Sequence, residues 1–232
     1  DQLTFLKASS KRAYRISNAN QAVAILHKAI QEAQTPPCGP VSVEIPIDIQ
    51  SAKIPLSLLT APLKRAPAVE PEASLVDALW AQLKQAKQPL LWLGGGALES
   101  GEAVKTLADA GVTVISSTHG RGILADSHRA SLRAFHNSPS VEVLISQCDF
   151  TLVAGSRLRS NETRSWTLEL PTPRVQIDID PAAASRNYLM DNTVVADCRA
   201  LLAALAARVQ GRMWGDARWD SQLKAAVEAA EQ

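Results

Sequence analysis

Short apolar segments alternate with amphipathic segments along most of the chain after residue 72, and this alternation limits the fold more than any other feature. The apolar segments are four to six residues long and lie at 90–93, 112–115, 150–154, 174–179 and 193–196. Runs of this length are typical of strands that are buried on both faces of a parallel sheet. The alternation predicts an α/β, doubly wound, mostly parallel sheet over residues 72–209.

The segments between the expected strands have the spacing of helices that cover a sheet. In the first, Leu75, Leu79 and Leu83 recur at intervals of four residues, which places them on one helix face. We expect helices at 73–87, around Val104 and Leu107, at 141–147 and at 199–209. We expect a last helix, within 210–232, to lead out of this domain towards a further C-terminal domain.

Proline divides the chain, because eight of its 13 prolines fall between Pro36 and Pro71. Residues 59–71 lack helical and strand periodicity and are interpreted as a linker. Before it, the sequence predicts one amphipathic helix at 22–33 and one short strand at 41–45. One helix and one strand cannot bury a core. We therefore expect residues 1–58 to be a helix-strand remnant of another α/β domain, and the chain to be a piece of a longer protein.

Composition excludes several classes of protein. The 24 Lys and Arg residues balance 23 Asp and Glu residues, so the basic surface of a dedicated nucleic-acid binder is missing. No run of 18 apolar residues and no secretory leader is visible, so we expect neither a membrane span nor export. The three cysteines have no CxxC spacing, which favours a reducing compartment and a cytoplasmic protein.

Gly94, Gly95 and Gly96 directly follow an expected strand and precede a helix. Glycines there allow a tight turn, and amides at a helix start can face a phosphate. The G-x-G-x-x-G spacing is incomplete because Glu99 occupies the third glycine position, and the next strand does not end in an acidic residue. These departures disfavour an NAD dehydrogenase. A nucleotide-phosphate site and a purely structural turn both stay open.

Two further loops follow expected strands and carry groups that can meet an anion: Ser117, Thr118 and His119 in the first, and Gly155, Ser156 and Arg157 in the second. Arg157 is either a phosphate clamp or a solvated side chain. His119 is more typical of a hydrogen-bonded surface group than of a base. No histidine has carboxylate or cysteine companions at metal spacing, so we predict no metal site.

Acidic residues end the fourth expected strand. Asp180 followed by Pro181 favours a helix start, with a capping carboxylate and a proline in the first helical position. Asp178 lies inside the strand and is a candidate acceptor for a ligand hydroxyl or amino group. No nucleophile elbow, Walker loop or HExxH motif occurs. We therefore assign no catalytic residue to this chain.

Taken in order, the motifs resemble those of thiamine-diphosphate-dependent enzymes, the group of acetolactate synthase, benzoylformate decarboxylase and pyruvate oxidase. The resemblance covers nearly the whole chain. Its motifs are 39–48, 89–96, 118–122 with 126–128, Asp149 before 155–157, and 177–181 before Ala196 and Asp197.

The resemblance implies that residues 1–58 end a pyrimidine-binding domain and that 72–209 form the central domain. That domain is Rossmann-like in this family and binds FAD in some members and nothing in others. The implied cofactor-binding residues are Gly94, Gly95, Gly96, Ser117, Thr118, His119, Gly155, Ser156, Arg157, Asp178, Asp180 and Asp197. Acetolactate synthases carry Arg-Phe-Asp-Asp where this chain has residues 157–161, Arg-Leu-Arg-Ser-Asn, which counts against FAD.

The parent is implied to be a 2-oxo-acid decarboxylase or carboligase that binds thiamine diphosphate and magnesium and forms a homodimer or homotetramer. The family's N-terminal glutamate and its C-terminal Gly-Asp-Gly…Asn segment have no counterpart here, since Gly215 and Asp216 are followed by Ala217. The resemblance implies that its partners are the missing pyrimidine-binding and diphosphate-binding domains of the same chain. We expect the chain to be inactive without them. Two alternatives are a stand-alone module that binds NAD or an adenine nucleotide, and a purely structural domain.

Overall fold

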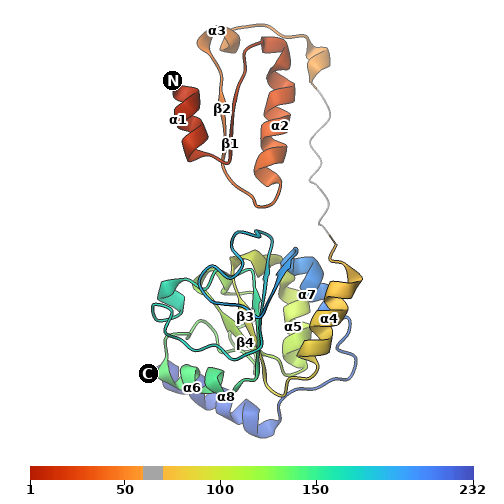
Figure 1. Cartoon of the computed structure of the whole chain (residues 1–232), viewed down its shortest axis with the longest axis vertical. Helices are drawn as coiled ribbons and strands as arrows, with labels where there is room; N and C mark the ends of the chain where they lie inside the picture. The colour runs from red at the N-terminus through yellow and green to blue at the C-terminus, as the bar shows by residue number, and fades with distance from the viewer. Residues whose placement is uncertain (60–69) are drawn as a thin grey trace. The chain divides into compact units, whose positions relative to one another are not determined.

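The computed structural model describes residues 1–59 and 70–232. The chain divides into two compact units, 1–67 and 68–232 (Figure 1). Residues 60–69, most of the segment interpreted as a linker, lie outside the described residues.

The larger unit contains one parallel sheet of strand order β4-β3-β5-β6-β7, and every neighbouring pair in it is parallel. The strands are β3 (Pro89–Leu93), β4 (Thr113–Ser116), β5 (Phe150–Ala154), β6 (Arg174–Asp178) and β7 (Asn192–Val195). The predicted α/β fold with a mostly parallel sheet is thereby confirmed. Each observed strand starts and ends within one residue of the apolar run that predicts it, because burial on both faces requires such runs.

A further extended segment borders β4 without being predicted from the sequence. Ser131 forms a parallel bridge with Val114. The Val114 amide donates to the Ala130 carbonyl, and the Leu132 amide donates to the Val114 carbonyl, each at 2.8 Å. Counting this segment as the third strand in sequence, the sheet follows the Rossmann order 3-2-1-4-5-6. The strand order therefore reverses between β3 and β5.

Helices cover both faces of the sheet (Figure 1). The helices are α4 (Ala73–Leu83), α5 (Gly101–Asp109), α6 (Pro139–Gln147), α7 (Cys198–Ala206) and α8 (Ala217–Ala230). Alternate residues of β3 belong to two different cores. Leu91 and Leu93 pack in the core that contains side chains of α4, α5 and α7. Leu90 and Trp92 pack in the core that contains side chains of α6 and α8. This alternation is the two-residue period of a strand. No helix among the described residues combines the length and the hydropathy needed to cross a bilayer.

The last helix, α8, is part of the second core. Trp219 and Leu223 are buried there, and the Trp219 Nε1 donates to Thr113 Oγ1 at 2.9 Å. The Asp216 carboxylate caps α8 by accepting the Trp219 amide at 2.8 Å. Residues 210–232 therefore belong to the same compact unit as the sheet. The expectation that they lead onward to another domain stays a prediction.

The smaller unit has more regular structure than the sequence predicts. Besides α2 (Ala22–Gln34) and β2 (Val41–Glu44), it contains α1 (Gln2–Ser9), β1 (Arg12–Arg15) and the short α3 (Ile47–Gln50). Strands β1 and β2 pair in parallel, so that α2 is the crossover of a βαβ unit. The prediction of a single strand is wrong here because Arg-Ala-Tyr-Arg lacks an apolar run. Among the unit's described residues, the buried apolar side chains are Ile16 and Ala29.

Candidate functional site

The loops after β3 and β5 meet where the strand order reverses, the place where open α/β sheets bind ligands. The Gly94 amide donates to the Ala154 carbonyl at 2.8 Å, and the Gly96 amide donates to the Gly155 carbonyl at 3.0 Å. The structure therefore brings the two glycine-containing loops together, as the sequence predicts for motifs at the carboxyl ends of neighbouring strands.

Direct contact between the two backbones explains the glycines. A Cβ atom on Gly94 would lie 2.1 Å from the Gly155 carbonyl oxygen, and one on Gly96 would lie 2.9 Å from the Gly155 Cα atom. Gly155 itself has a φ of 60°, a left-handed conformation that glycine adopts without strain. Gly94 and Gly96 therefore both require the absence of a side chain.

The glycine turn does not fit the phosphate cradle of a dinucleotide site. The amides of Gly94 and Gly96 already donate to the loop after β5, and the Ala97 amide donates to the Gly94 carbonyl at 3.1 Å. A 3-10 stretch from Gly95 to Ser100 follows the turn, and α5 begins only at Gly101. Two of the three glycine amides are thus engaged by protein carbonyls, and no α-helix N-terminus directly follows the turn to bind a phosphate. Of the two alternatives for these glycines, the geometry favours the structural turn.

The loop after β4 lies beside this turn. A Cβ atom on Gly95 would lie 3.2 Å from the His119 Cβ atom. Ser117 Oγ accepts the Gly120 amide at 3.2 Å, and the side chains of Thr118 and His119 are exposed. Ser117 therefore shapes the loop, while Thr118 and His119 are free to meet a ligand.

Arg157 and Ser156 differ in their surroundings. Arg157 is half-exposed, with its Nη2 at 3.5 Å from Asp180 Oδ2, so that its charge is partly balanced. Ser156 is buried, and its carbonyl accepts Gln176 Nε2 at 3.0 Å. Gln176 Oε1 in turn accepts the Ser185 amide at 2.9 Å. Sequence reasoning missed this bridging amide, although a glutamine inside the apolar strand β6 is a visible signal.

The acidic residues after β6 and β7 bond mainly to backbone amides. Asp178 Oδ1 accepts the Asp180 amide at 2.9 Å, and Asp180 Oδ1 accepts the Ala182 amide at 3.0 Å. Asp197 caps α7, where its Oδ1 accepts the Arg199 amide at 2.8 Å. The predicted helix start at Pro181 is wrong: residues 181–185 form turns, because Gln176 takes the Ser185 amide that a helix would use.

Asp178 is the most perturbed carboxylate of this edge. It is buried, and burial raises its pKa above the ordinary value of 3.8, while the Asp180 amide and the Arg157 charge oppose that rise. Folding therefore favours the protonated form. The stability contribution of this group is complete below pH 3.8 and is lost as the pH rises through the raised pKa.

Replacing Asp178 by Asn is expected to raise the free energy of unfolding at pH 7, because an amide keeps the acceptor for the Asp180 backbone without a buried charge. The gain should shrink towards pH 3, which urea denaturation at several pH values measures. Asp191→Asn is the matched control, since Asp191 also accepts a backbone amide, that of Arg174 at 2.7 Å, but is exposed. A loss of stability in Asp178→Asn at pH 7 would contradict the assignment.

Sequence reasoning also missed a buried ionisable pair beneath the loop after β4. Glu162 is 2% exposed, and its Oε1 accepts the Thr118 amide at 3.2 Å. His136 is 6% exposed, and burial lowers its pKa, while Glu162 and a hydrogen bond with the Ser116 backbone oppose that shift. No sequence signal distinguishes either residue, because tertiary contacts alone bring the two segments together.

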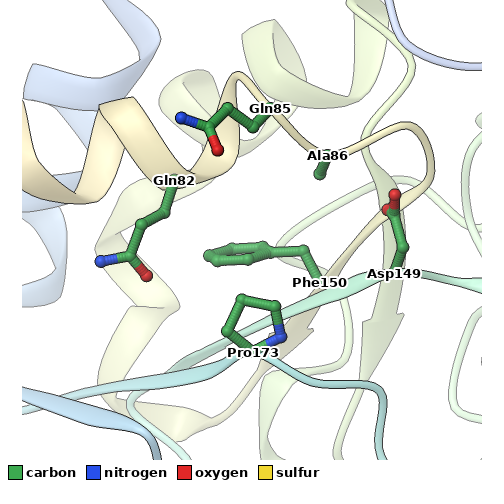
Figure 2. A pocket seen from close by; sticks show the side chains of 6 residues that line it. All are labelled: Gln82, Gln85, Ala86, Asp149, Phe150 and Pro173. Carbon is green, nitrogen blue, oxygen red and sulfur yellow. The ribbon is translucent and has the colours of Figure 1, made fainter.

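An open pocket of about 170 Å³ lies at the opposite, amino-terminal edge of the sheet. Figure 2 shows the ring of Phe150 in it, with Pro173 on one side and Gln82 of α4 on another. The Asp149 carboxylate accepts the amides of Lys87 and Gln88, each at 2.8 Å. Asp149 therefore fixes the start of β3, and the pocket contains none of the predicted site residues.

Comparisons with known proteins agree with the fold and with the family that the motifs resemble. The family model of the thiamine pyrophosphate enzyme central domain matches residues 76–205, more than half of the chain. The chain is 26% identical to the acetolactate synthase large subunit of Corynebacterium glutamicum, over 84% of this chain and 33% of the relative. It is 30% identical to the pyruvate oxidase of Lactiplantibacillus plantarum, over 86% of this chain and 34% of the relative.

A solved structure supports the same fold. It is described as a thiamin diphosphate-dependent enzyme from Mycobacterium smegmatis and superposes with a TM-score of 0.72 at 23% identity, covering 89% of this chain and 41% of that one. The chain spans about a third of the length of the curated relatives named above.

Proposed function

We propose that this chain, which belongs to the thiamine pyrophosphate enzyme family through its central domain, is part of a 2-oxo-acid decarboxylase or carboligase resembling acetolactate synthase. The observation that carries the proposal is the family match over 76–205. In the same proposal, the βαβ unit of residues 1–58 ends a pyrimidine-binding domain. The parent enzyme is cytoplasmic and assembles as a homodimer or homotetramer.

Thiamine diphosphate, when bound, supplies the electron sink for decarboxylation. The described residues of this chain contain no group of three or more His, Cys, Asp or Glu side chains that could hold the accompanying magnesium ion. We therefore place no step of the reaction on this chain. Its role in the proposal is to connect the domains that bind the cofactor.

The same proposal leaves the central domain without flavin. The amides of Gly94 and Gly96 bond to protein carbonyls, Arg157 lies beside Asp180, and Asp197 caps α7. Most of the groups that would hold a flavin diphosphate or ribose thus already have a protein partner. The alternative of a stand-alone NAD or adenine-nucleotide module requires the same groups and is disfavoured for the same reason.

A thermal-shift experiment on the chain with FAD, ADP or NAD tests the absence of a nucleotide site. A ligand at a hundred times its Kd stabilises the folded state by about 2.7 kcal/mol, a readily visible shift. We expect no shift with any of the three. Stabilisation by FAD would establish a flavin site, and stabilisation by NAD or ADP without FAD would favour the alternative module.

The family activity needs the whole protein. Sequencing outward from Asp1 and Gln232 should reveal an upstream glutamate-bearing region and a downstream Gly-Asp-Gly…Asn segment. The full-length protein should release CO₂ from a 2-oxo acid such as pyruvate only when thiamine diphosphate and Mg²⁺ are both present. A parent gene lacking both segments would refute the proposal.

A further inference from the structure

Two buried polar atoms near the carboxyl end of β3 have no hydrogen-bond partner. They are Trp92 Nε1 and His136 Nδ1. Trp92 is fully buried and His136 is 6% exposed. The two rings are neighbours, with centroids 6.1 Å apart and planes tilted by 43°. An orphaned buried polar group destabilises the folded state, so two neighbouring ones require an explanation.

The two atoms have opposite hydrogen-bonding character. An indole Nε1 is only a donor. The His136 ring bonds to the Ser116 backbone, and burial lowers its pKa, which favours the neutral ring. Because Nδ1 has no partner, the bond to Ser116 is made by Nε2. A neutral ring that donates from Nε2 has a bare acceptor at Nδ1. A donor and an acceptor therefore lie on neighbouring buried rings, and neither has a hydrogen-bond partner.

We propose that a single buried water molecule bridges Trp92 Nε1 and His136 Nδ1. The water accepts from the indole and donates one hydrogen to the imidazole. We assign its second hydrogen to the carboxylate of Glu162, which is buried and whose charge acts on His136. Buried waters typically make about three hydrogen bonds of this kind to otherwise unsatisfied groups.

This water would join three parts of the large unit. Trp92 belongs to β3, His136 follows the extended segment that borders β4, and Glu162 lies in the loop after β5. The Asn137 side chain, which donates to the Asn161 carbonyl at 3.0 Å, already holds the last two segments side by side.

A crystal structure of the chain provides the direct test. We expect an ordered water within about 3.2 Å of both nitrogen atoms. Empty density between the rings, or a direct contact between the two nitrogen atoms, would overturn the proposal.

A double-mutant cycle provides the second test, with Trp92→Phe and His136→Phe. Each single change removes one anchor of the water and leaves the other polar atom unsatisfied. The double change removes both polar atoms, so no buried group is left unsatisfied. We expect the fold-loss in the folding equilibrium constant of the double variant to be at least fivefold smaller than the product of the two single fold-losses, roughly the scale of coupled neighbours.

The control cycle pairs His136→Phe with Trp219→Phe. Trp219 donates directly to Thr113 at the start of β4, whereas His136 bonds near the end of that strand. The two losses should therefore multiply, as for independent sites. Equal behaviour of the two cycles would refute the bridge. If a variant fails to fold, the crystal structure of the unaltered chain still shows whether the water is present.

Discussion

Replacing Gly94 by Ala is expected to lower the free energy of unfolding of the large unit by about 3 kcal/mol or more. The added Cβ atom would lie 2.1 Å from the Gly155 carbonyl oxygen and 2.4 Å from the Ser156 Cα atom. Both atoms are backbone, so relief requires the loops after β3 and β5 to separate. That separation breaks the bonds from the Gly94 and Gly96 amides.

Urea denaturation followed by tryptophan fluorescence measures this effect, because all five tryptophans lie in the unit 68–232. Gly95→Ala is the matched control, since its Cβ atom would lie 3.2 Å from the His119 Cβ atom and 3.7 Å from the His119 carbonyl oxygen, with no contact under 3 Å. We expect that variant to lose about 1 kcal/mol or less, since a small shift of the loop after β4 relieves a contact of this length. Equal losses at Gly94 and Gly95 would contradict the backbone contact as the reason for these glycines.

Replacing Trp219 by Ala is expected to destabilise the large unit by roughly 3–5 kcal/mol. The indole is buried in the core shared by α6 and α8, and its removal leaves a cavity and deprives Thr113 Oγ1 of its donor. An effect of this size follows only if α8 is part of the central unit. The same denaturation experiment measures it.

Trp166→Ala is the control for that prediction. Trp166 is 51% exposed, and its indole bonds to the Leu158 carbonyl at 3.1 Å. Its loss should cost about 1 kcal/mol, the usual scale for a largely exposed side chain. If Trp219→Ala lowered the free energy of unfolding by no more than this control does, the packing of α8 on the sheet would contribute little to stability. Helix α8 would then be a connector that is separable from the central unit.

The strands of the large unit could be read from the sequence because each is a short apolar run. The extended segment at 130–133 could not, because its place beside β4 depends on hydrogen bonds to Val114 rather than on its own residues. Strand β1 was missed for a similar reason. Its Arg-Ala-Tyr-Arg sequence has no apolar pattern, and only pairing with β2 makes it a strand.

The sequence predicted which loops gather at one edge of the sheet, because motifs that follow parallel strands must do so, and the structure brings the loops after β3, β4 and β5 together. What each residue does there could not be inferred. Asp197 resembles a ligand-binding residue in sequence but caps α7, and the predicted helix at Pro181 gives way to a turn held by Gln176. Glu162 and His136 carried no signal, since their burial arises from packing between distant segments.

The sequence by itself determined the α/β class, the parallel sheet and the family, because apolar periodicity and the order of motifs are properties of the chain alone. Only the tertiary structure decided why the glycines are needed. Both a phosphate cradle and a tight turn require glycine, and the 2.1 Å approach of a Gly94 Cβ atom to the Gly155 carbonyl distinguishes them. That approach depends on two loops separated by about sixty residues, so it follows from how the strands are ordered and not from either loop.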